Sequence, residues 1–246
     1  MPHQTILVLD FGSQFTQLIA RRLRELSVYS EILPFNTPPE AIRAKQPQGL
    51  ILSGGPSSVS DPGAPRPDPG VLALGLPTLG ICYGMQLMTD MLGGAVARAP
   101  HREFGHALVR RENASARMLR NLPGELRVWA SHGDVVTSVP PGFQVTATSA
   151  NAPVAAMEAP DRGYYGLLFH PEVVHTDRGA DMLRNFAFDV CGCSGDWTIR
   201  SFIDESTARI RAQAGEGRVV CALSGGVDST VAATLIHHAI GDRLQC

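Results

Sequence analysis

The sequence predicts an α/β protein built on a mixed sheet with flanking helices, followed by the beginning of a second α/β unit. Continuous apolar runs, typical of parallel strands covered on both faces, occupy residues 5–9, 49–53 and 77–81. Shorter alternating strands, separated by Pro and Gly and therefore indicating an antiparallel addition, occupy residues 126–129, 145–148, 154–157 and 164–169. A new apolar run at 218–223 predicts the first strand of the second unit.

Helices are expected where apolar residues recur at helical spacing between and after these strands. The expected helices span residues 15–26, 85–92, 178–190, 199–214 and about 230–240. We therefore divide the chain into a first domain at 1–190, a linker at 191–216 and a second domain from 217 to 246. Because the second domain holds one strand and one helix here, we expect this stretch to be poorly ordered or to pack on the preceding domain.

Composition excludes several classes of function. The 246 residues include 21 Lys and Arg against 23 Asp and Glu, which argues against nucleic-acid or polybasic membrane binding. No apolar run approaches the roughly 20 residues of a membrane span, and the first residues lack a signal-peptide pattern, so we expect a cytoplasmic protein. Five cysteines are too few for a disulfide scaffold. Cys191 and Cys193 have no second pair at zinc spacing, so no metal site is expected.

Cys82 is the first candidate catalytic residue. It directly follows an apolar strand and precedes a helix within Gly80-Ile-Cys-Tyr-Gly-Met-Gln86. The free N–H groups at a helix N-terminus stabilise a thiolate, and Gly84 suits a tight turn beneath the side chain. A buried cysteine that acts as a small apolar residue is the alternative. Position alone leaves these two interpretations about equal.

His170 and Glu172 favour the catalytic interpretation. Pro171 holds the preceding residue extended, and residues two apart on an extended chain face the same side, so Glu172 can orient the imidazole. Cys, His and a carboxylate are the components of an activated thiolate nucleophile. Ser53-Gly-Gly-Pro56 follows another strand and can supply backbone N–H groups to an oxyanion, although a plain Gly-Pro turn also explains it.

These motifs together carry a family resemblance. Gly80-Ile-Cys-Tyr-Gly-Met-Gln86, His170-Pro-Glu172 and Ser53-Gly-Gly-Pro56 resemble the class I glutamine amidotransferases, which have a flavodoxin-like mixed sheet. The segments that narrow the resemblance to the glutamine-hydrolysing GMP synthases are Asp10-Phe-Gly-Ser-Gln14, Arg102-Glu-Phe-Gly105 and Ser131-His-Gly-Asp134. The resemblance covers nearly the whole chain.

The resemblance implies a role for each matching residue. Cys82 would form a γ-glutamyl thioester, with His170 as general base and acid and Glu172 as its orienting partner. The backbone N–H groups of Gly55 and Tyr83 would form the oxyanion hole. The residues that would bind glutamine are Gln86, Ser131, His132, Gly133 and Asp134.

A second motif, Ser224-Gly-Gly-Val-Asp-Ser229, lies between the predicted strand and helix of the second unit. Backbone amides at such a junction favour an anion, although a Gly-rich turn is the alternative. The motif resembles the pyrophosphate loop of ATP pyrophosphatases, an adenine nucleotide α hydrolase-like fold. The resemblance implies an ATP-binding loop formed by Ser224, Gly225, Gly226, Val227, Asp228, Ser229 and Thr230.

For the whole protein, the resemblance implies ATP-dependent amination of XMP to GMP with ammonia from glutamine. ATP and Mg²⁺ would act as co-substrate and ion, with no tightly bound cofactor, and full-length members would be homodimers. Two alternatives are a free-standing γ-glutamyl hydrolase and an inactive regulatory fragment. A free-standing hydrolase would leave the Ser224–Ser229 loop unexplained. An inactive fragment would not need the catalytic residue types found at Cys82, His170 and Glu172. His237 and His238 are interpreted as surface or packing residues, and Cys221 as an inert thiol within a buried strand. His175, close to the His170-Pro-Glu172 turn, is expected to do no more than support the residues that act there.

Overall fold

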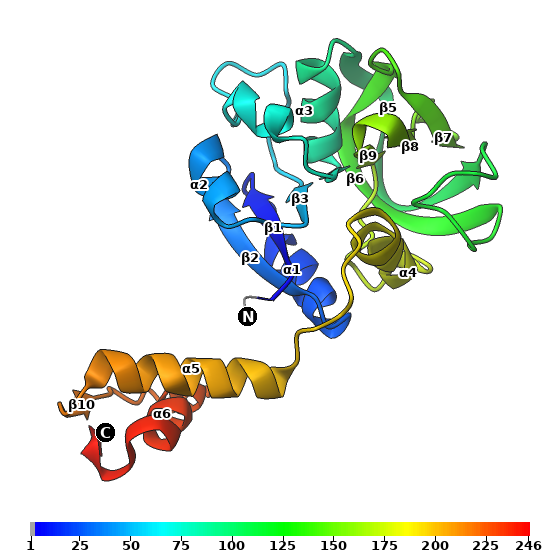
Figure 1. The fold of residues 1–246 in the computed structure, drawn as a ribbon. Helices are drawn as coiled ribbons and strands as arrows, with labels where there is room; N and C mark the ends of the chain where they lie inside the picture. The colour runs from blue at the N-terminus through cyan, green and yellow to red at the C-terminus, as the bar shows by residue number, and fades with distance from the viewer. Residues whose placement is uncertain (1–2) are drawn as a thin grey trace. The chain divides into compact units, whose positions relative to one another are not determined.

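The computed structural model describes residues 3–246 and divides the chain into two units (Figure 1). The first unit ends at Asp196, and the second runs from Trp197 to Cys246. The expected linker, 191–216, is therefore shared between them, because its long helix belongs to the second unit. Among the described residues, no helix combines the length and the apolar character that crossing a bilayer requires.

Among the described residues of the first unit, nine strands form one mixed sheet in the order β2-β1-β3-β4-β9-β8-β7-β5-β6. The parallel strands are β1 (Thr5–Asp10), β2 (Tyr29–Pro34), β3 (Gly49–Leu52), β4 (Thr78–Ile81) and β9 (Tyr164–Leu167). The antiparallel strands are β5 (Ala95–Arg111), β6 (Glu125–Ser138), β7 (Gln144–Ser149) and β8 (Ala156–Ala159). The expected parallel core with an antiparallel addition is confirmed, but the expectation that residues 164–169 belong to the antiparallel addition is wrong. β9 joins the parallel core through its pairing with β4, and the antiparallel addition begins at β8 on its other edge.

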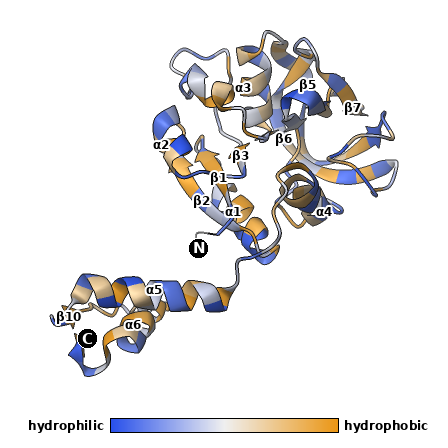
Figure 2. Cartoon of the chain, viewed as in Figure 1, coloured by the Kyte–Doolittle hydropathy of each residue, from blue (hydrophilic) through white to orange (hydrophobic). Residues whose placement is uncertain are grey.

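Helices cover the parallel strands on both faces. They are α1 (Thr16–Glu25), α2 (Pro39–Ala44), α3 (Tyr83–Met91) and α4 (Gly179–Arg184), which a π-helical turn extends through Asn185–Val190. Alternate residues of β1 enter two different cores: Ile6 packs with Ile19 of α1, whereas Leu7 packs with Ile42 of α2. All are fully buried, and Figure 2 shows the matching hydrophobic colour on β1. Burial on both faces explains the continuous apolar pattern.

Two strands differ from the sequence expectation. β2 at the sheet edge is mostly half-buried, so its sequence shows no clear alternation. β5 begins at Ala95, in a stretch where no strand is expected, because most of its residues stay exposed or half-buried. The pairing of β5 with β6 is irregular between Arg98 and Glu103, where β5 carries extra residues. This irregularity lies beside the site described below.

The second unit contains α5 (Ile199–Ala214), β10 (Val219–Val220), α6 (Val227–Ile240) and β11 (Leu244–Gln245). The expectation of a buried strand over 218–223 is wrong: β10 has two residues, and Val220 is 78% exposed. Its short pairing with β11 covers neither face. The segment that follows α5 folds back on that helix, where Arg211 Nε donates to the carbonyl oxygen of Ala239 at 2.8 Å.

Candidate active site

Cys82 lies on a tight turn between β4 and α3. Its backbone has φ 51° and ψ −108°, a conformation that costs a non-glycine residue about 1–3 kcal/mol. Close packing holds it there, because a Cβ on Gly84 would lie 2.2 Å from the carbonyl oxygen of Leu52. The Cys82 N–H also donates to Leu167 of β9 at 2.7 Å. The turn therefore depends on β3 and β9, the strands on either side of β4.

His170 and Glu172 follow β9 and form a buried pair. His170 Nδ1 lies 2.8 Å from Glu172 Oε1, and Glu172 is fully buried. The Phe15 ring meets the imidazole edge-on, with 5.1 Å between centroids. Burial disfavours the charged imidazole, but Cys82 and Glu172 outweigh this effect and raise the pKa of His170 to about 10. The imidazole is therefore cationic at neutral pH.

Cys82 and His170 meet beside Gly54. A Cβ on Gly54 would lie 3.1 Å from His170 Cε1 and 3.7 Å from Cys82 Cβ, so a side chain there would press on the imidazole and touch Cys82. The two also line a common cavity of about 370 Å³. Parallel pairing of β4 with β9 places these strand ends next to each other. A thiolate and an imidazolium stabilise each other in this arrangement.

The two proposed oxyanion donors belong to adjacent segments. Gly55 packs so closely that an added Cβ would lie 2.7 Å from the carbonyl oxygen of Phe11 and 3.4 Å from the Tyr83 ring. Tyr83 is the first residue of α3. Ser53 Oγ fixes the Gly55 loop, because it accepts from the Phe11 N–H at 3.0 Å and donates to the Gly54 carbonyl at 2.8 Å.

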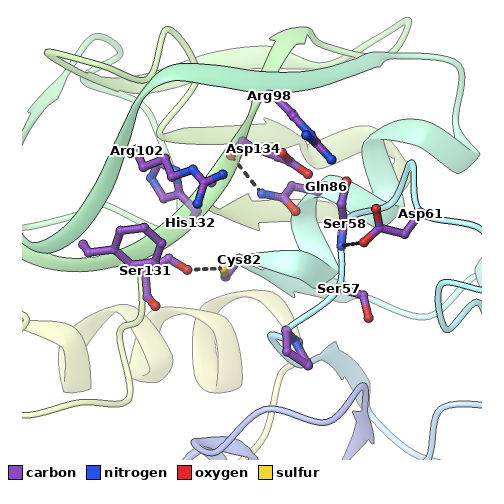
Figure 3. Close-up of a pocket in the computed structure, with 14 residues that line it drawn as sticks. Ser57, Ser58, Asp61, Cys82, Gln86, Arg98, Arg102, Ser131, His132 and Asp134 are labelled. Carbon is purple, nitrogen blue, oxygen red and sulfur yellow. Dashed lines mark hydrogen bonds between the residues drawn. The ribbon is translucent and has the colours of Figure 1, made fainter.

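The proposed glutamine-binding residues line a second cavity of about 360 Å³, which Cys82 also lines (Figure 3). Gln86 comes from α3, and the others come from β6. Cys82 Sγ lies 3.5 Å from the carbonyl oxygen of Ser131. The Gln86 side-chain amide donates to the carbonyl of Asp134 at 3.0 Å, which fixes α3 to β6. The other residues of this set that line the cavity are His132 and Gly133.

Sequence reasoning assigned no role to several cavity residues. Arg98 and Arg102 enter it from β5, on the side opposite Ser57 and Ser58 (Figure 3). Asp61 and Phe104 also line it. The motif Arg102-Glu-Phe-Gly105 was the available signal, but it gave no role to any side chain.

Glu103 in that motif contacts the glutamine-binding set. Its carboxylate accepts from Ser149 Oγ at 3.0 and 3.1 Å and lies 3.2 Å from His132 Nε2. Burial lowers the pKa of His132 against the opposing effect of the Glu103 carboxylate. Glu103 therefore connects β5 to β6 and to the end of β7, directly after the irregular segment that carries Arg98 and Arg102.

The Ser224–Thr230 segment of the second unit forms an exposed turn that leads into α6. Gly225 has φ +78°, which favours glycine, and Ser229 Oγ lies 3.0 Å from Ser224 Oγ. The Ser229 and Thr230 hydroxyls donate to the carbonyl of Gly226 at 3.0 and 2.9 Å. Asp228 lies in the first helical turn, and Val227 begins α6.

None of the remaining candidates is among the residues that line the two cavities at Cys82. Burial raises the pKa of the Cys193 thiol to about 11 and raises that of Cys191 further. His237 and His238 are exposed on α6, and His175 packs against Trp129 with 4.7 Å between ring centroids. Cys221 is half-buried beyond β10. Within residues 3–246, no group of three or more His, Cys, Asp or Glu side chains gathers to hold a metal ion.

Comparison with known proteins decides the family. The model of the glutamine amidotransferase class-I family matches residues 7–190. The chain belongs to this family. A solved structure from Thermoplasma acidophilum, assigned to a GMP synthase, is 32% identical, with a TM-score of 0.68 over 78% of this chain and 96% of that chain. A glutamine amidotransferase from Thermotoga maritima shares the fold at 20% identity and a TM-score of 0.56, over 97% of this chain and 91% of that chain.

Two curated relatives match this class-I amidotransferase over the whole chain. Proteins named glutamine-hydrolyzing GMP synthase from Syntrophomonas wolfei subsp. wolfei and Geobacillus kaustophilus are 53% and 56% identical over 246 residues. The match covers 100% of this chain but 48% of each relative. The chain thus spans about half the length of the curated relatives that it matches.

Proposed function

We propose that the first unit hydrolyses glutamine to glutamate and ammonia with Cys82 as nucleophile, His170 as proton carrier and Glu172 as the carboxylate that orients His170. The decisive observation is the arrangement of Cys82 and His170 around Gly54, with Glu172 2.8 Å from the imidazole. A thiolate beside an imidazolium is the reactive form of such a nucleophile. The adjoining cavity of about 360 Å³ would hold the amino acid.

The reaction proceeds through a covalent intermediate. The Cys82 thiolate attacks the γ-carboxamide carbon, and the Gly55 and Tyr83 N–H groups donate to the oxyanion. The C–N bond breaks as the His170 imidazolium gives its proton to the departing nitrogen, which leaves as ammonia. The neutral imidazole then accepts a proton from water as that water attacks the thioester, so that the C–S bond breaks, glutamate leaves and the ion pair is restored.

The whole protein would use this ammonia to aminate XMP to GMP with ATP. The curated relatives' names support this extension, and the class-I family supports glutamine as the nitrogen donor. The Ser224–Thr230 turn at the start of α6 would receive ATP phosphates, with Mg²⁺ entering as the nucleotide complex. A free-standing hydrolase would not need this turn. The homodimer and the cytoplasmic location stay predictions.

The Cys82→Ala variant tests the glutaminase proposal. Loss of the nucleophile removes the covalent route and should lower ammonia release from glutamine by several orders of magnitude, with thermal unfolding unchanged. Cys221→Ala, which removes a half-buried thiol in the second unit, is the matched control and should keep wild-type activity. A glutamine analogue with an electrophilic γ-carbon should add its mass to Cys82 alone. Near-normal ammonia release by Cys82→Ala would refute the proposal.

A binding experiment tests the proposed nucleotide site separately. Titration of the chain with Mg-ATP and with pyrophosphate should perturb the amide signals of Ser224–Thr230 in an NMR spectrum. Replacement of Ser229 by Ala should weaken this effect, because it removes the hydroxyl that joins the two ends of the turn. Unchanged signals at millimolar ligand would contradict the assignment of the turn and leave the glutaminase proposal intact.

A further inference from the structure

The His170 segment leaves the sheet before it reaches the active site. β9 ends at Leu167, and one more backbone hydrogen bond follows it, from the Leu168 N–H to the carbonyl oxygen of Ala155 at 2.9 Å. The His170 N–H instead donates to the carbonyl of Trp129 at 3.0 Å. Trp129 belongs to β6, which lies at the far end of the sheet order from β9. The backbone of His170 is therefore held by a strand with which β9 does not pair.

Thr176 closes this connection into a ring of three hydrogen bonds. Its hydroxyl accepts from the Trp129 N–H at 2.9 Å and donates to the carbonyl of His170 at 2.6 Å. The third bond is the one from the His170 N–H to Trp129. Thr176 is 6% exposed, so water does not readily replace its hydroxyl. The hydroxyl uses both its donor and its acceptor capacity within the ring.

We propose that Thr176 is a positioning residue that fixes His170 relative to β6 and thereby aligns proton transfer with bound substrate. The proposal rests on the glutaminase function. Trp129 lies two residues before Ser131, whose carbonyl contacts Cys82 Sγ. The same strand therefore carries the substrate cavity wall and the anchor of the imidazole. A displacement of His170 relative to this wall by about 1 Å would cost proton transfer up to 100-fold.

Backbone bonds also tie the segment to β6, from His170 to Trp129 and from the Asp177 N–H to the carbonyl of Arg127 at 2.8 Å, and Thr176 is the side chain that joins the two ends. Arg22 Nε donates to the carbonyl of Glu172 at 3.0 Å, which fixes the chain beyond Pro171. Glu172 Oε1 and the Phe15 ring set the tilt of the imidazole. Neither contact joins the His170 backbone to β6. Loss of the Thr176 hydroxyl would also leave the N–H of the half-buried Trp129 without this partner, which favours movement of the segment.

Three variants test the proposal. Thr176→Val keeps the shape but removes the hydroxyl, and Thr176→Ser keeps the hydroxyl. Thr146→Val is the matched control, because the Thr146 hydroxyl is buried in β7 without a hydrogen-bond partner among the described residues. For Thr176→Val we expect kcat for glutamine to fall about 10- to 100-fold with KM within about twofold. Thr176→Ser and Thr146→Val should stay within about threefold of wild type.

A second measurement separates this role from stability and from the glutaminase proposal itself. Alkylation of Cys82 by iodoacetamide depends on the neighbouring His170 and needs no glutamine. The alkylation rate of Thr176→Val should fall toward the alkylation rate of His170→Ala. Both rates are measured at a temperature where thermal melting shows that the two variants are folded. If Thr176→Val does not fold, Thr176→Ala provides the same loss of hydroxyl. Wild-type kcat and alkylation in the folded variant, or an equal loss in Thr176→Ser, would overturn the proposal.

Discussion

Replacing Gly84 by Ala should damage both stability and catalysis. Alanine normally favours a helix over glycine by about 1 kcal/mol. Here the new Cβ would lie 2.2 Å from the carbonyl oxygen of Leu52 and 2.7 Å from its Cβ. Real contacts do not fall below 3.0 Å, so α3 and β3 must separate by at least about 0.8 Å. The obstacle is backbone, which cannot rotate away, and overpacking of this kind costs about 1–3 kcal/mol.

Separation of α3 from β3 would also move the two backbone N–H groups proposed to bind the oxyanion. Gly55 follows β3, and Tyr83 begins α3. Loss of one aligned donor lowers kcat by about 10²- to 10³-fold in other enzymes. We therefore expect kcat for glutamine hydrolysis to fall about 100-fold in Gly84→Ala, measured as ammonia release, together with a lower melting temperature.

Gly124→Ala is the matched control for Gly84→Ala. Its added Cβ would meet nothing within 4 Å, and its φ lies outside the left-handed region. It should leave kcat unchanged. A Gly84→Ala protein with wild-type melting and with kcat within threefold of wild type would show that the turn has room for a side chain, and the packing argument would fail.

Two further perturbations address charge and substrate binding. Replacing Glu172 by Gln should move the alkaline limb of the kcat/KM profile from near pH 10 downward by about 1–3 pH units, because the carboxylate helps to hold the proton on His170. A pH–rate profile of glutamine hydrolysis measures this shift. An alkaline limb that does not move would contradict the ion pair between Glu172 and His170. In wild type, the stability contributed by protonated His170 should be complete below about pH 6.5 and lost as pH rises through about 10. Gln86→Leu should raise KM for glutamine about 10-fold or more, since it removes a buried hydrogen bond to the carbonyl of Asp134. Alkylation of Cys82 by iodoacetamide should change little. An unchanged KM would show that Gln86 does not belong to the glutamine-binding residues.

The sequence was informative where a strong local pattern marks a buried strand or a reactive side chain at the end of a strand. Apolar runs identified β1, β3 and β4, because strands buried on both faces have no polar side to interrupt them. Cys82 follows β4, and His170 follows the strand that the sequence predicts over 164–169. Parallel strand ends share one edge of the sheet, so the proximity of the two residues could be expected. Their shared contact with Gly54 needs coordinates.

Residues that act through long-range or irregular contacts could not be predicted. Arg98 enters the cavity through an irregular stretch of β5, and such extra residues leave no periodic signal. Thr176 resembles any loop threonine in the sequence, because its partner Trp129 is far away along the chain. The expected burial of 218–223 was wrong for a related reason: an apolar run predicts burial only where neighbouring elements cover it, and Val220 has no such cover.

Pairing of β4 with β9 has a consequence for how activity appears during synthesis and folding. Chain growth is vectorial, so Cys82 and its helix emerge from the ribosome long before His170. Until β9 arrives, the Cys82 N–H lacks its acceptor on Leu167, and the strained turn is held by β3 alone. Joining segments so distant in sequence is also a slow step in folding. A nascent chain should therefore carry an inert thiol, and glutamine hydrolysis should begin only when the last strand of the sheet is in place.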